Sequence, residues 1–132
     1  MPIITTSSVA RRHHDERGST SIQMTVLMPL LFLVVFTALQ AGLYFYGRAA
    51  ALSAATTGAR AAAAETGTAH DCEVAASAFI AGIGDVLGSP RVTCVRTATT
   101  ATATVAGATL SIVPGLSLQA EQTAIAPAER VT

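Results

Sequence analysis

An uninterrupted apolar stretch limits the folds open to this chain more than any other feature. No residue from Gly18 to Gly47 carries a charge, and Ile22 to Tyr46 reads IQMTVLMPLLFLVVFTALQAGLYFY. An α-helix rises about 1.5 Å per residue, so about 20 residues cross a hydrocarbon core of about 30 Å. The stretch is long enough for that crossing, and we predict one transmembrane helix.

Arginines flank this stretch unequally. Arg11, Arg12 and Arg17 precede it, whereas Arg48 alone follows closely. Because cytoplasmic flanks carry the excess of basic residues, we expect a cytoplasmic N-terminus and an extracytoplasmic C-terminal part in a single-pass protein of the cell membrane. The expected division is a cytoplasmic tail over residues 1–18, a transmembrane helix with an extracytoplasmic extension over 19–65, and a small extracytoplasmic domain over 66–132.

A secretory signal peptide is the alternative interpretation of the same stretch. Its apolar region normally ends after about 7 to 15 residues at a small-residue cleavage site. Here the apolar character continues to Phe45, and the nearest small-residue sites lie late, around Ala41 or Ala51. The pattern favours a retained helix over a released soluble domain.

The apolar stretch continues as an alanine-rich segment, GRAAALSAATTGARAAAAE, from Gly47 to Glu65. Alanine has the highest helix propensity, so we expect one joined helix of about forty residues that ends at Thr66-Gly67. Small side chains bury little area, so this helical extension must lie against the following domain or against other subunits.

The remaining sequence predicts a second helix and three strands. Asp71 is the expected start of a helix that runs to Leu87, and Gly88-Ser89-Pro90 is expected to stop it. Alternating patterns predict strands at Arg91–Arg96, Thr99–Val105 and Leu116–Ala126, with a turn at Arg96–Ala98, a connection through Gly107 and Pro114-Gly115, and frayed residues from Pro127 to Thr132. The fold class is therefore α+β: a long N-terminal transmembrane helix that extends into a small pilin-like head with a second helix and a three-stranded antiparallel sheet.

The two cysteines, Cys72 and Cys94, both fall in the part expected outside the cytoplasm. In an oxidising compartment such a pair predicts one disulfide, between the second helix and the first strand. A nucleophilic cysteine with His70 as its base is disfavoured, since adjacency in sequence does not supply the geometry. A zinc site from residues 70–73 is disfavoured because the usual paired spacings are missing.

Several function classes find no support in the sequence. His13 to Glu16, HHDE, holds metal-ligand residue types, but four adjacent residues in a polar tail do not converge on one ion, and a solvated tail is preferred. The formal charge is zero, and no basic cluster exceeds Arg11-Arg12, so nucleic acid is not an expected partner. Phosphate-binding glycine loops and nucleophile elbows are missing. We expect a structural or assembly protein without enzymatic activity or cofactor.

The sequence from Arg17 onward begins RGSTSIQMTVLMP. It has a basic residue, a glycine and a short polar stretch, followed by a long apolar helix that contains a proline. This layout resembles the TadE-like family of tight-adherence pilus assembly proteins, relatives of type IV pilins and pseudopilins, over Arg17 to roughly Ala64. The resemblance implies cleavage between Gly18 and Ser19 by a prepilin peptidase. It also implies other pilin-like subunits and a pilus assembly platform as partners.

The fifth residue after that cleavage point, Gln23, departs from the family pattern, which usually has glutamate there. In pilins the carboxylate is thought to pair with the N-terminal amine of a neighbouring subunit, because a buried ammonium is costly when unpaired. An amide accepts a hydrogen bond but supplies no negative charge. Gln23 is then either a weakened assembly contact or simply a polar residue near the membrane face.

Two functions therefore remain open from the sequence. One is a pilin-like membrane protein that acts in pilus assembly. The other is a membrane-anchored or secreted small extracellular binding domain unrelated to pili.

Overall fold

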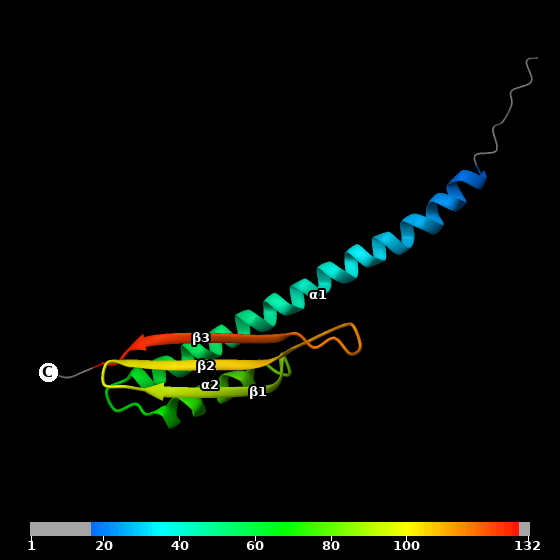
Figure 1. The fold of residues 1–132 in the computed structure, drawn as a ribbon. Coiled ribbons are helices and arrows are strands. Elements are labelled where there is room, and N and C mark those ends of the chain that lie inside the picture. Colours follow the sequence, from blue (N-terminus) through cyan, green and yellow to red (C-terminus); the bar gives the residue numbers. More distant parts are fainter. Residues whose placement is uncertain (1–16, 130–132) are drawn as a thin grey trace, which may run out of the picture. The chain divides into compact units, whose positions relative to one another are not determined.

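The computed structural model describes residues 17–129, and the side chains from Thr20 onward. The chain forms two units, one up to Val35 and one from Phe36 onward. Helix α1, Arg17–Ala63, begins in the first unit and ends in the second, which also holds α2 (Ala69–Gly82), β1 (Leu87–Arg96), β2 (Thr100–Thr109) and β3 (Gln119–Pro127). The predicted α+β class is confirmed (Figure 1).

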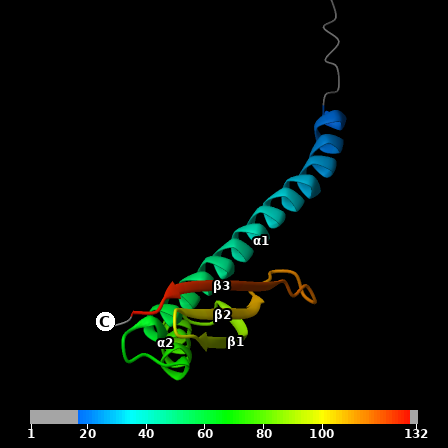
Figure 2. The ribbon, with the colours of Figure 1, turned by 60° about the vertical axis from the view of Figure 1, so that its left-hand side comes forward.

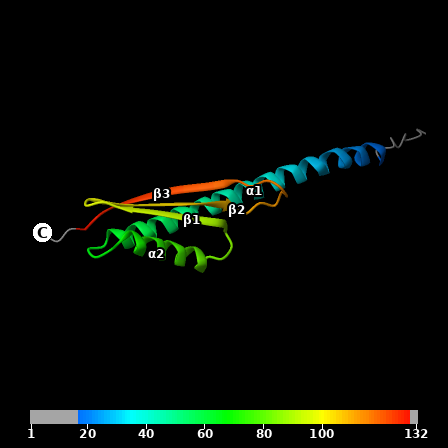
Figure 3. The same ribbon diagram turned by 60° about the horizontal axis from the view of Figure 1, so that its bottom comes forward.

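The three strands form an antiparallel sheet in the order β1-β2-β3. Cys94 pairs with Ala103, and Ala103 pairs with Ala124, so these three residues share one face of the sheet. Helix α2 and the alanine-rich part of α1 lie on the same side of the sheet, as Figure 3 shows. Along β2 every second residue is buried, as expected for a strand with one covered face.

Small side chains build the core between the helices and the sheet. The alanine-rich part of α1 contributes a buried row of alanines, and β2 contributes Val105 and two alanines, all at most 1% exposed. The alanines are Ala51, Ala54, Ala55, Ala59 and Ala62 in α1 and Ala101 and Ala103 in β2. Alanines on both surfaces let the helix and the sheet approach closely, which compensates in part for the small area that each one buries. The alanine-rich part of α1 was expected to lie against the following domain or against other subunits. In the structure it packs on the following domain. We call residues 50–129, which hold this core, the folded domain.

Helix α2 starts earlier and ends earlier than the sequence predicted. Its N-cap is Thr68, not Asp71, and it ends at Gly82, not at Leu87. Thr68 and Asp71 form a capping box, in which each side chain binds the other residue's backbone N–H, so the start lies one turn before the predicted cap. The early end has a backbone reason, because Gly84 adopts a left-handed φ of 80° that does not continue a right-handed helix.

The strands also differ in their limits from the prediction. The segment Gly88-Ser89-Pro90, predicted to lie between elements, belongs to β1, where an irregularity in register falls between Gly88 and Arg91. A bulge of this kind accommodates a proline, which has no N–H to donate to the ladder. Gly107, predicted to lie in a connection, is inside β2, and β3 begins at Gln119 instead of Leu116.

The connection between β2 and β3, Leu110–Leu118, is called the β2–β3 loop. It contains a turn in which the Leu116 N–H binds the Val113 carbonyl at 3.2 Å, with Gly115 at a φ of 82°, so Pro114-Gly115 lies in a connection as predicted. The loop lies at the end of the sheet away from the C-terminus (Figure 2).

The residues just after β3 are bound to the rest of the domain, contrary to the predicted fraying from Pro127. Pro127 ends β3, the Ala128 N–H donates to the Thr99 carbonyl at 2.9 Å, and the Glu129 N–H donates to the Ala63 carbonyl at 2.9 Å. The second bond satisfies a carbonyl at the C-terminal end of α1, where no further helical N–H is available.

Candidate functional site

The apolar part of α1 exposes its large side chains. From Ile22 to Phe36 they are between 44% and 70% exposed. Among residues 17–129, α1 is the one helix that is long and apolar enough to cross a membrane, and its most apolar stretch is not buried within the protein. A soluble protein rarely leaves so continuous an apolar surface without a partner. The surface supports anchoring in a membrane.

The predicted processing and assembly residues all lie near the start of this helix. Gly18 and Ser19 belong to the first turn of α1, and Gln23 lies just over a turn further on with an exposed side chain. Their roles stay predictions. The segment His13–Glu16, considered above for metal binding, lies outside the described residues.

Gln40 has polar partners that were not predicted from the sequence. Although it sits within the apolar stretch, its side chain is only 9% exposed. Its Oε1 accepts a hydrogen bond from the Ile112 backbone N–H at 2.9 Å and lies 3.2 Å from the Ser111 hydroxyl, which donates to it. Its Nε2 lies 3.5 Å from the Leu110 carbonyl. All three of these contacts are with the β2–β3 loop.

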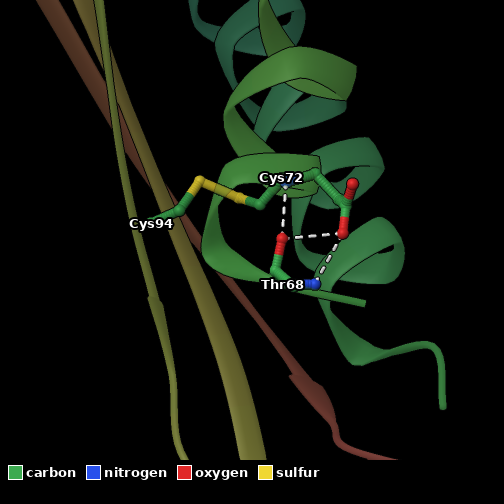
Figure 4. The surroundings of a disulfide bond; sticks show 4 residues. Thr68, Cys72 and Cys94 are labelled. Carbon is green, nitrogen blue, oxygen red and sulfur yellow. Dashed lines mark hydrogen bonds between the residues drawn. A yellow bond between two sulfur atoms is a disulfide. The ribbon is translucent and has the colours of Figure 1, made fainter. Parts of the chain in front are cut away.

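The predicted disulfide between Cys72 and Cys94 is present. It joins the first turns of α2 to β1, with the two Cα atoms 6.2 Å apart, and Cys72 is fully buried (Figure 4). A sulfur held in this bond is neither a nucleophile nor a zinc ligand. Groups of three or more metal-ligand side chains are not found among residues 17–129.

Next to the disulfide, Thr68 and Asp71 hold the start of α2. The Asp71 carboxylate accepts hydrogen bonds from the Thr68 N–H at 2.8 Å and the Thr68 hydroxyl at 2.7 Å (Figure 4). The hydroxyl oxygen is also 3.2 Å from the Asp71 N–H. The hydrogen bonds from the Thr68 side chain and backbone, with a smaller contribution from His70, hold the pKa of Asp71 below its usual value of 3.8.

Helix α1 approaches α2 closely at Gly58. A Cβ atom built on Gly58 would lie 3.0 Å from the Cys72 sulfur and 3.1 Å from the Ala76 Cβ. The absence of a side chain at Gly58 makes room for the helix that bears Cys72. The sequence held no signal for this, because the contact joins residues of separate elements.

The described residues thus combine an exposed apolar helix with a disulfide-linked domain. The family model for TadE-like protein matches residues 18–60. The match begins at the predicted processing site and includes the alanine-rich part of α1, and it confirms the resemblance inferred from the sequence. Searches of curated proteins and of solved structures gave no match.

Proposed function

Because residues 18–60 carry the TadE-like pattern, we propose that the chain is a pilin-like, single-pass membrane protein that acts in the assembly of a tight-adherence, type IV-like pilus. It is a structural component and not an enzyme. The observation that carries the proposal is the continuity of α1, whose apolar stretch is exposed and whose alanine-rich stretch forms the spine of a disulfide-linked α+β domain. A helix of this kind suits lipid at one end and protein packing at the other.

The proposed orientation follows the arginine bias, with residues 1–18 in the cytoplasm and the folded domain outside. A disulfide supports this placement, since such bonds persist in oxidising compartments. We propose that a prepilin peptidase removes residues 1–18 and leaves Ser19 as the first mature residue. The further partners are other pilin-like subunits and the pilus assembly platform.

Gln23 bears on the kind of assembly. Without a carboxylate at this position, the N-terminal amine of a neighbouring subunit would find a hydrogen-bond acceptor but no opposite charge. Packing between subunits would then depend on the exposed apolar surface of α1. This favours an accessory or minor subunit over the main filament subunit.

The test is the mass of the mature chain, extracted from membranes of cells with and without a tight-adherence prepilin peptidase. We expect an N-terminus at Ser19 only when the peptidase is present, and no trimming of a Gly18→Leu variant. Gly42→Leu is the matched control, because the same substitution at this exposed glycine of α1 meets no neighbouring atom within 4 Å and leaves the cleavage point intact.

Two results would contradict the proposal. An N-terminus near Ala41 or Ala51 would support the second function, a secreted binding domain. An intact Met1 in the presence of the peptidase would leave a membrane-anchored binding domain that is not processed as a pilin.

A further inference from the structure

We propose that the β2–β3 loop is a second membrane contact, which inserts between lipids beside α1 at the level of Gln40. The occupant of this surface is the lipid bilayer. The inference rests on the membrane anchor and not on a role in pilus assembly.

The first observation is the character of the loop. It reads LSIVPGLSL from Leu110 to Leu118, and the chain carries no charge from Thr97 to Ala120. Four of its large apolar side chains are between 41% and 48% exposed: Leu110, Ile112, Val113 and Leu116. Loops in water are usually polar. Exposure of these four apolar side chains to water is unfavourable, and contact with lipid would remove it.

The second observation places the loop along α1. Its residues 110–112 bind the Gln40 side chain, and the bond from the Ile112 N–H is 2.9 Å long. Gln40 precedes Tyr46 by six residues, which is about 9 Å along a helix axis. Tyrosine rings favour the headgroup region, so Gln40 and the loop bound to it lie at the level of the upper acyl chains.

The third observation is that several backbone N–H and C=O groups of the loop have hydrogen-bond partners within the protein. Gln40 accepts a hydrogen bond from the Ile112 N–H. The Ser111 hydroxyl oxygen accepts one from the Val113 N–H at 3.2 Å and lies 3.1 Å from the Val113 carbonyl. At the base of the loop, the Thr109 N–H donates to the Leu118 carbonyl at 2.8 Å. Backbone enters an apolar environment only when its polar groups are paired, and these bonds pair several of them. The apolar loop is therefore suited to a lipid environment beside the part of α1 around Gln40.

The experiment measures the depth of single probes on the full chain in nanodiscs of phosphatidylcholine and phosphatidylglycerol that hold one copy each. Cys72 and Cys94 are bonded to each other, so an introduced cysteine is the one free thiol for an environment-sensitive nitrobenzoxadiazole label. The positions are Val113→Cys in the loop, Thr123→Cys on the exposed outer face of β3, and Leu31→Cys in the apolar helix as a reference for insertion.

We expect blue-shifted emission at position 113 and several-fold stronger quenching by lipids with a spin label at the fifth acyl carbon than at position 123. Water-like emission at 113, with quenching at 31, would overturn the loop contact while leaving the anchor in place. A lack of quenching at 31 would remove the anchor and the loop contact together. Shielding at 113 that arises only when two copies share a disc would show that the loop docks on a second copy, and would also overturn the proposal.

Discussion

Gly58 of α1 lies directly against Cys72 of α2, and a Cβ atom in its place would stand 3.0 Å from both the cysteine sulfur and its backbone carbonyl oxygen. Cys72 therefore packs directly on α1 at Gly58. The hydrogen atom of glycine fits there, whereas a larger side chain would displace the neighbouring atoms. The two consecutive helices α1 and α2 meet there, and the disulfide links α2 on to β1 of the sheet.

Gly58→Val should destabilise the folded domain by about 2 kcal/mol or more, because its methyl groups force α1 and α2 apart in a closely packed core. Thermal melting of the full chain in detergent measures the effect. Gly82→Ala in α2 is the matched control: its Cβ would meet nothing within 4 Å, so it should stabilise by up to about 1 kcal/mol through helix propensity. An unchanged melting temperature for Gly58→Val would contradict the close approach.

Loss of the disulfide should lower the melting temperature. The bond closes a loop with a sequence separation of 22, for which chain entropy predicts about 3 kcal/mol of stabilisation. Cys72→Ser with Cys94→Ser should therefore melt lower than the wild type, and reductant should lower the wild type alone. Equal melting of all samples, with and without reductant, would rule out a stabilising bridge.

Acid should weaken the start of α2 through Asp71. Because its pKa is lowered in the folded protein, its contribution to stability is complete above the ordinary value of 3.8 and is lost as the pH falls through the lowered value. The melting temperature of the wild type should fall between about pH 5 and pH 2, and Asp71→Asn should show a smaller fall over this range. The same acid response in Asp71→Asn and wild type would exclude the capping carboxylate as a cause.

Gln40→Leu should release the β2–β3 loop from α1. The substitution leaves the Ile112 N–H without its acceptor, and an unsatisfied buried donor costs about 1 to 3 kcal/mol. Hydrogen exchange of the Ile112 amide should speed up about tenfold or more, which corresponds to about 1.4 kcal/mol. Ser111→Ala removes the hydroxyl contacts to Gln40 and to Val113 but leaves Ile112 its acceptor, so the exchange of the Ile112 amide should change less. Unchanged protection in Gln40→Leu would show that the bond does not hold the loop.

The membrane helix and the overall class could be predicted because both follow from local composition and period. An apolar, uncharged stretch of this length is stable only in an apolar environment. The alternation of alanine or valine with threonine along Thr99–Val105 predicts a strand with one buried face. The disulfide was also predictable, since two cysteines leave one pairing. Element limits were less accurate: the capping box at Thr68 was overlooked, and the bulge that brings Gly88-Ser89-Pro90 into β1 depends on the neighbouring strand.

By itself, the sequence determined an apolar helix, an alanine-rich continuation, a second helix and three strands, because these depend on interactions within a few residues. The tertiary structure decided which surfaces meet. It brought Gly58 against Cys72 and bound Gln40 to a loop some 70 residues away, as sequence separations of 70 to 72 record. Contacts of this kind depend on how packed elements approach one another, and no local pattern of residues encodes that approach.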